Sequence, residues 1–155
     1  MILTTHALTG AVIGKNINNI YLIILLSIIT HYAMDTLRHG EYLNRKSSFK
    51  NTWWKVSLDI FIGLFIVSLM ILSNFNSMTN NKIFHILLGV FFSMLPDLFT
   101  VLYWKLNIKP LKILFDFHAK IHKYPQASPE REWTMRNARN DILISLLAIL
   151  LFLFF

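Results

Sequence analysis

Apolar runs separated by short polar segments dominate the chain, and they predict a series of helices. Residues 2–14 form a short apolar run that ends in the polar turn at 15–19. The next run, 20–38, crosses the ~30 Å hydrocarbon core of a bilayer at 1.5 Å per residue if its last turns reach the interface. Two more runs, at 53–72 and 82–104, are each long enough to cross. The pattern therefore predicts a helical membrane bundle.

The stretch after Pro110 has a different period and predicts an amphipathic helix on the membrane surface. Its apolar positions recur at helical spacing: Leu111, Leu114, Phe115 and Ile121. His118 and His122 continue this stripe, and charged residues take the opposite face. Ser128 followed by Pro129 is typical of a helix start, so we expect a last helix from there.

The apolar part of this last helix, 142–155, is about 21 Å long at 1.5 Å per residue, which is short for a full crossing. The expected fold is all-α, with four to five membrane helices and one cytoplasmic amphipathic helix. We expect residues 1–155 to form a single integral membrane domain. A hydrophobic content of 55 % and a mean hydropathy of +0.51 agree with this expectation.

Charge predicts the orientation in the membrane. The net charge is +7, and much of it lies in segment 38–55, whose basic residues are Arg38, Arg45, Lys46, Lys50 and Lys55. Segment 73–82 carries only Lys82. By the positive-inside bias, segment 38–55 faces the cytoplasm of a bacterial-type inner membrane. The expected partner is the lipid bilayer, because no basic run interleaved with aromatic residues favours a nucleic acid.

The polar residues that carry chemistry begin with His31, Asp35 and His39, which follow one another at i, i+4 spacing. If they are helical, all three share one face and offer ligand atoms for zinc or manganese. Cysteine is absent, so a metal must use imidazoles and carboxylates. The alternative is an ion pair of Asp35 with Arg38 or His39.

Depth along the helices predicts that further polar residues join this group. Asp59 lies about 9 Å in from Trp53, and Asp97 lies about 10 Å in from Trp104, both from the cytoplasmic end. His6 lies in the cytoplasmic half of the first helix. A carboxylate in mid-helix costs about 2.5 to 3.5 kcal/mol, so something must neutralise these acids.

We therefore predict a polynuclear site with two divalent ions, zinc or manganese. Its expected ligands are His6, His31, Asp35, His39, Asp59, Asp97, His118 and His122. Pro96, immediately before Asp97, interrupts the helix and frees a backbone carbonyl at membrane depth, which a buried group is expected to use. The alternative is a structural polar cluster in which Lys55 pairs with Asp59 and Arg38 pairs with Asp35.

Such a site predicts a membrane-embedded hydrolase that acts on a lipid or phosphoester. The carboxylates Asp35, Asp59 and Asp97 are expected to bridge the ions or accept the proton of water. Three arginines near the start of the last helix are candidates for holding a head group: Arg131, Arg136 and Arg139. The alternative is a non-enzymatic metal-binding membrane protein, such as a transporter, a sensor or a scaffold.

Four short motifs resemble those of a family of small, uncharacterised bacterial membrane proteins, and more distantly the LexA-binding, inner-membrane metal-dependent hydrolases. They are Thr5-His6-Ala7-Leu8-Thr9-Gly10, His31-Tyr32-Ala33-Met34-Asp35 with His39-Gly40-Glu41, Leu95-Pro96-Asp97, and Phe117-His118-Ala119-Lys120-Ile121-His122. The resemblance implies metal ligation at His31, Asp35, Asp97, His118 and His122.

Overall fold

The computed structural model describes residues 1–43, 48–125 and 128–155. Within these ranges the chain forms six α-helices: α1 (Leu3–Asn16), α2 (Ile20–Asp35), α3 (Phe49–Ser73), α4 (Asn80–Leu106), α5 (Lys112–Ile121) and α6 (Met135–Phe154). It also forms three 3-10 turns: η1 (Phe75–Ser77), η2 (Lys109–Leu111) and η3 (Pro129–Arg131). In the same ranges, the only β-type pairing is an isolated bridge between Glu41 and Glu132. The all-α prediction is confirmed.

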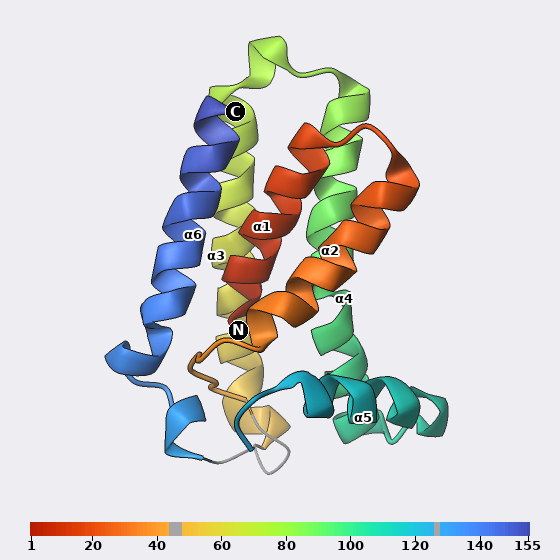
Figure 1. Cartoon of the computed structure of the whole chain (residues 1–155), viewed down its shortest axis with the longest axis vertical. Helices are drawn as coiled ribbons and strands as arrows, with labels where there is room; N and C mark the ends of the chain where they lie inside the picture. The colour runs from red at the N-terminus through yellow and green to blue at the C-terminus, as the bar shows by residue number, and fades with distance from the viewer. Residues whose placement is uncertain (44–47, 126–127) are drawn as a thin grey trace.

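Helix α1 lies at the centre of the bundle and packs against α2, α3, α4 and α6. Figure 1 shows α3, α4 and α6 along the long axis of the molecule, with α5 lying across one end. Among the described helices, three are long and apolar enough to cross a membrane: α3 from Lys50, α4 and α6. Helix α2 is apolar but shorter, at 16 residues. The basic residues Arg45 and Lys46, used above to predict orientation, lie outside the described residues.

Close packing of α1 on α4 depends on glycine. A Cβ atom added at Gly10 would lie 2.3 Å from the carbonyl oxygen of Gly89, and one at Gly14 would lie 2.1 Å from the carbonyl oxygen of His85. Small residues let membrane helices approach closely and gain van der Waals contact. The glycines therefore set the distance between the central helix and the helix that carries Asp97.

Two predicted helix ends differ in the structure. The run 20–38 is helical only to Asp35, so His39 lies beyond α2 rather than on its face. The predicted helix start at Ser128 is also wrong, because Ser128 precedes η3, and α6 begins at Met135 after the N-cap Thr134.

Contacts of Asn137 and Glu132 explain why the helix does not start before α6. The Asn137 side-chain amide donates to the carbonyl oxygens of Pro129 and Glu132 at 2.8 and 2.7 Å. Glu132 is extended and pairs with Glu41. The Asn137 contacts within the segment and the bridge to Glu41 hold a non-helical backbone where local propensity favours a helix.

Candidate metal centre

The Asp35 carboxylate, at the last residue of α2, lies at the centre of a buried polar cluster. Its Oδ2 atom is 2.8 Å from His118 Nε2, 3.1 Å from His31 Nε2 and 3.8 Å from His122 Nε2. Its Oδ1 atom is 3.4 Å from His6 Nε2. Imidazoles from α1, α2 and α5, and one just beyond α5, thus surround one carboxylate.

Two sets of described residues place their ligand atoms close enough to hold an ion. The first set is His31, Asp35, Asp97 and His118, and the second is Asp35, His39 and His122; within each set the ligand atoms lie within 4.8 Å of one another. Asp35 belongs to both sets. The buried cluster could therefore hold a metal ion.

Hydrogen bonds to the far side of two imidazoles fix which nitrogen faces the cluster. His31 Nδ1 donates to the Ser93 carbonyl oxygen at 2.7 Å, which leaves Nε2 facing Asp35. The Thr100 hydroxyl donates to the Pro96 carbonyl oxygen at 3.2 Å, so it accepts from His118 Nδ1 at 3.0 Å. Metal-binding histidines almost always have such an outer partner, which sets the tautomer and the ring orientation.

The carbonyl that His31 uses lies in the turn of α4 just before Pro96. Pro96 has no N–H to donate to the carbonyl four residues back, and α4 nevertheless continues through it. His31 takes the neighbouring carbonyl, that of Ser93. The carbonyl that His31 uses is thus next to the one that Pro96 frees, and use of the freed carbonyl itself stays a prediction.

His6 is fully buried, and its nearest polar contact is a long one, from Nε2 to Asp35 Oδ1 at 3.4 Å. Both of its ring nitrogens lack a partner among the described residues, and its ring stacks on that of His31 with centroids 4.0 Å apart. Its Nε2 atom lies 3.8 Å from Asp97 Oδ2. An unsatisfied buried polar group costs about 1–3 kcal/mol. A cation between His6 and the two carboxylates would remove this cost, so the residues present fit a bound metal.

Ion pairing does not account for Asp35 in the way the alternative suggested. The Arg38 guanidinium donates from Nε to Asn137 Oδ1 at 2.5 Å instead. The amino group of Met1 lies 2.5 Å from Asp35 Oδ1 and places one positive charge beside it.

Asp59 lies on α3, and its carboxylate meets the N-terminus of α1, outside both sets of candidate ligands. Its Oδ2 atom accepts from Leu3 N–H at 2.8 Å and from the Tyr42 hydroxyl at 2.6 Å. Its Oδ1 atom accepts from Thr4 N–H at 3.0 Å and from the Thr4 hydroxyl at 2.6 Å. These are N–H groups that a helix start leaves without a partner, and a carboxylate there also complements the helix dipole.

Asp141 also accepts a hydrogen bond from the N-terminus of α1, and it was not predicted from the sequence. It is buried on α6, and its Oδ1 atom accepts from Ile2 N–H at 3.0 Å. Asp141 lies immediately before the apolar run 142–155, so it resembles the polar end of a membrane helix. Only its depth, similar to that of Asp59, could have indicated a buried role.

The three arginines proposed to hold a head group do not come together. Arg131 is buried, pairs with Glu41 and donates to the Tyr124 carbonyl oxygen at 3.0 Å, whereas Arg136 and Arg139 are exposed.

Burial would raise the pKa of Glu41, but hydrogen bonds from His39 and Arg131 and the guanidinium charge lower it to about 2. Burial lowers the pKa of His122 to about 3.

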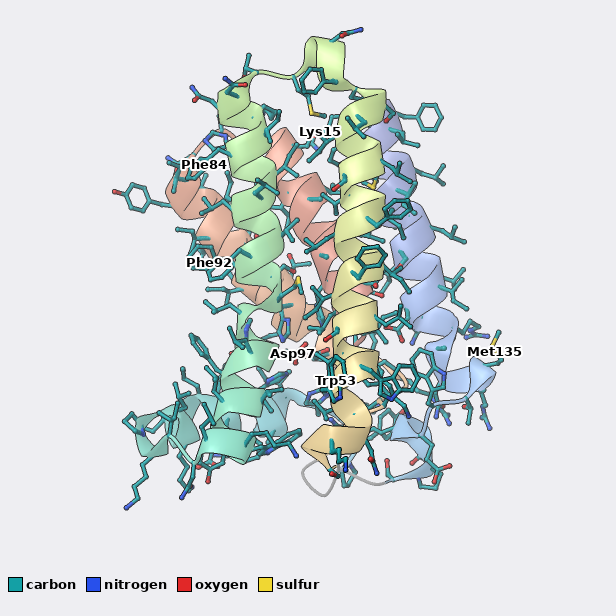
Figure 2. All side chains as sticks on the ribbon, turned by 180° about the vertical axis from the view of Figure 1, so that it is seen from behind. Lys15, Trp53, Phe84, Phe92, Asp97 and Met135 are labelled. Carbon is teal, nitrogen blue, oxygen red and sulfur yellow. The ribbon has the colours of Figure 1, made fainter. Side chains whose placement is uncertain are left out.

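A cavity of about 760 Å³ adjoins the cluster, and Asp97, His118 and His122 form part of its wall. The Asp97 side chain is 26 % exposed, whereas those of His31 and Asp35 are fully buried. Figure 2 shows Asp97 between the ribbons of α3 and α4. The candidate metal centre is therefore accessible from one side, through Asp97.

Comparison of the chain with family models, with curated proteins and with solved structures found no match. The candidate metal centre is therefore argued from its own geometry. The resemblance to the LexA-binding hydrolases stays a prediction.

Proposed function

We propose that this chain is a membrane-embedded, metal-dependent hydrolase with its site at the cytoplasmic side of the inner membrane. The convergence of His31, Asp35, Asp97 and His118, whose ligand atoms lie within 4.8 Å of one another, carries the proposal. The outer partners of His31 and His118 support it, because they orient both Nε2 atoms toward one point.

The donor set favours zinc or manganese. It contains imidazole nitrogens and carboxylate oxygens and no thiolate, which suits a borderline or hard divalent ion. We propose two ions, with Asp35 shared between them, because this residue belongs to both sets.

Hydrolysis follows from what these residues can do beside a cavity. When bound, a divalent ion would polarise the scissile bond and lower the pKa of water toward neutrality. Asp97 is the carboxylate of the cluster that faces the cavity, so it is positioned to accept the proton that water loses. Asp35 is enclosed by imidazoles, and its role is to hold the ions.

A transporter is less well supported than a hydrolase. A path for an ion needs polar residues on both sides of the membrane, whereas the ligands described here gather at one end of the bundle. Lys15, labelled in Figure 2, lies at the other end. There its ammonium group donates to the Phe152 carbonyl oxygen, which makes it a cap for α6.

Metal analysis of the purified protein tests the first half of the proposal. We expect the wild type, supplied with zinc or manganese, to retain one or two ions per chain. Loss of an outer hydrogen-bond partner weakens metal binding about 10- to 100-fold. His31→Ala and His118→Ala each remove a ligand itself, so each should weaken binding by more than that. His85→Ala is the matched control, because His85 lies on α4 about 18 Å from Asp97 at 1.5 Å per residue. A wild type that retains no stoichiometric metal contradicts the proposal.

Hydrolysis is tested separately with metal-loaded protein and chromogenic esters, phosphomonoesters and phosphodiesters. Asp97→Asn, assayed in excess metal that restores its metal content, should abolish turnover, whereas Asp116→Asn should leave it unchanged. Asp116 is the control because it pairs with Lys112 on the exposed face of α5, at 2.5 Å. A metal-loaded wild type that hydrolyses none of these substrates would favour the alternative, a non-enzymatic metal-binding protein.

A further inference from the structure

The cavity beside the metal centre is mainly apolar, and two membrane-spanning helices supply its side walls. Helix α3 contributes Val56, Ile60 and Leu64, and α4 contributes apolar residues from Leu87 to Val101. Its volume of about 760 Å³ lies in the range of about 300–1,000 Å³ that ligand sites occupy. The chain therefore encloses room for a molecule much larger than water or a metal ion.

The cavity extends along α4 from Leu87, past Asp97, to Trp104. Its walls between Leu87 and Asp97 are apolar, and Asp97, His118 and His122 join it to the metal centre. The ten residues from Leu87 to Asp97 correspond to about 15 Å along α4. This shape matches an extended apolar chain that ends in a reactive polar group.

Two residues that line the cavity, Trp104 and Arg131, each carry a buried hydrogen-bond donor with no partner among the described residues. The donors are Trp104 Nε1 and Arg131 Nε. An N–H group left unsatisfied in this way is costly. The other Arg131 contacts, to Glu41 and to the Tyr124 carbonyl, hold its guanidinium in place.

The cavity lies between two helices that pack mainly on other partners. Helices α3 and α4 each pack on α1, and extended contact between α3 and α4 is absent from the described residues. Leu64, Phe91 and Leu98 line the cavity and are 41, 54 and 47 % exposed, so they form its rim toward the surrounding lipid. Figure 2 is viewed onto this side, with α3 and α4 in front.

From these observations, and given the hydrolase proposed above, we infer that the substrate is a lipid whose apolar chain lies in the cavity between α3 and α4, with its ester or phosphoester at the metal centre. The chain enters sideways from the bilayer. Lipid tails are as apolar as leucine, so the chain gains little from leaving the bilayer. The cavity therefore selects its lipid by fit and chain length.

The test uses alkyl phosphonates that carry a spin label on the chain, because their carbon–phosphorus bond resists hydrolysis. The protein is placed in phosphatidylcholine nanodiscs, and electron paramagnetic resonance measures the immobilised fraction of the probe. Ile60→Trp narrows the cavity part-way along its length and should reduce this fraction. Phe61→Trp is the matched control, because Phe61 is the next residue on α3 and is 63 % exposed. It should behave as the wild type.

A second variant tests the fit to chain length. Leu64→Trp shortens the apolar part of the cavity, so it should immobilise an octyl phosphonate and fail to immobilise a hexadecyl phosphonate. The wild type should immobilise both. Misfolding does not produce this selectivity, so the result decides the inference even where Ile60→Trp fails to fold.

The outcomes separate this inference from the proposed function. In one outcome the protein binds metal and hydrolyses esters, but Ile60→Trp and Leu64→Trp immobilise every probe as the wild type does. The cavity then holds ordinary bilayer lipid, and the inference is overturned. Where the wild type immobilises the probe in a way that both variants alter but retains no metal, the chain site stands and the hydrolase proposal fails.

Discussion

Asp59 and Asp97 lie at a similar depth of the bundle, but replacing each by asparagine should affect a different property of the protein. Asp59→Asn removes a charge from the start of α1, where the carboxylate accepts from Leu3 N–H, the Tyr42 hydroxyl and two donors of Thr4. Asp97→Asn removes a carboxylate that lies 3.8 Å from the His6 imidazole and 3.9 Å from the His118 imidazole. We expect the first change to reduce stability and the second to reduce metal binding.

The magnitude for Asp59→Asn follows from its hydrogen bonds. The asparagine oxygen can keep the two bonds to Thr4, although a neutral acceptor binds more weakly than a carboxylate. Its NH₂ group faces Leu3 N–H, which is then left without an acceptor, whereas the Tyr42 hydroxyl can rotate to accept. One unsatisfied buried donor and two weakened bonds together cost about 2–5 kcal/mol. That is a large part of the about 5–15 kcal/mol by which folded proteins are stable.

Unfolding in mixed micelles with increasing dodecyl sulfate, followed by helical circular dichroism, measures the free-energy change in metal-free protein. Metal content is measured on the same preparations. We expect Asp59→Asn to unfold at lower denaturant and still bind metal, and Asp97→Asn to unfold near the wild type and lose metal. An Asp59→Asn protein with unchanged stability and no bound metal would refute the capping role and return Asp59 to the ligand set.

Two further predictions concern the groups that support the site. Thr100→Val removes the hydroxyl that accepts from His118 Nδ1, so the metal affinity measured by chelator competition should fall about 10- to 100-fold; an unchanged affinity contradicts this support. Gly10→Ala places a Cβ atom 2.3 Å from the Gly89 carbonyl oxygen, whereas at Gly63 the nearest atom is 3.1 Å away. Overpacking costs about 1–3 kcal/mol, so Gly10→Ala should lower stability to unfolding more than Gly63→Ala, and equal effects would refute the close approach.

The helices could be predicted from the sequence because their signal is local. Apolar runs of membrane length and the stripe around His118 are properties of adjacent residues, and they predicted helices close to α1, α2, α3, α4 and α5. The end of α2 and the start of α6 could not be predicted in the same way. Asn137 sets the start of α6 through its bonds to Pro129 and Glu132, and the bridge between Glu41 and Glu132 joins residues about 90 positions apart.

The cluster was predictable in part for a similar reason. Charge in the connecting segments orients each run, and spacing along a run gives the depth of each polar residue. Depth brought His31, Asp35 and Asp97 to one end of the bundle, and the structure brings them together there. Depth does not give the direction in which a side chain points around its helix. For that reason Asp59 was assigned to the metal and Asp141 was missed.

The position of the α1 N-terminus explains why one end of the bundle holds so many acids. A helix of 14 residues is about 21 Å long, which is less than the ~30 Å hydrocarbon core, so a central helix of this length starts or ends inside the bundle. Its first N–H groups then need buried acceptors, which Asp59 and Asp141 supply. His6 lies two residues after Thr4, so the same acceptors fix the height at which its imidazole meets Asp35. The carboxylates that cap α1 therefore influence the proposed metal site through the position of His6. Loss of the cap should displace His6 while leaving the other ligands in place.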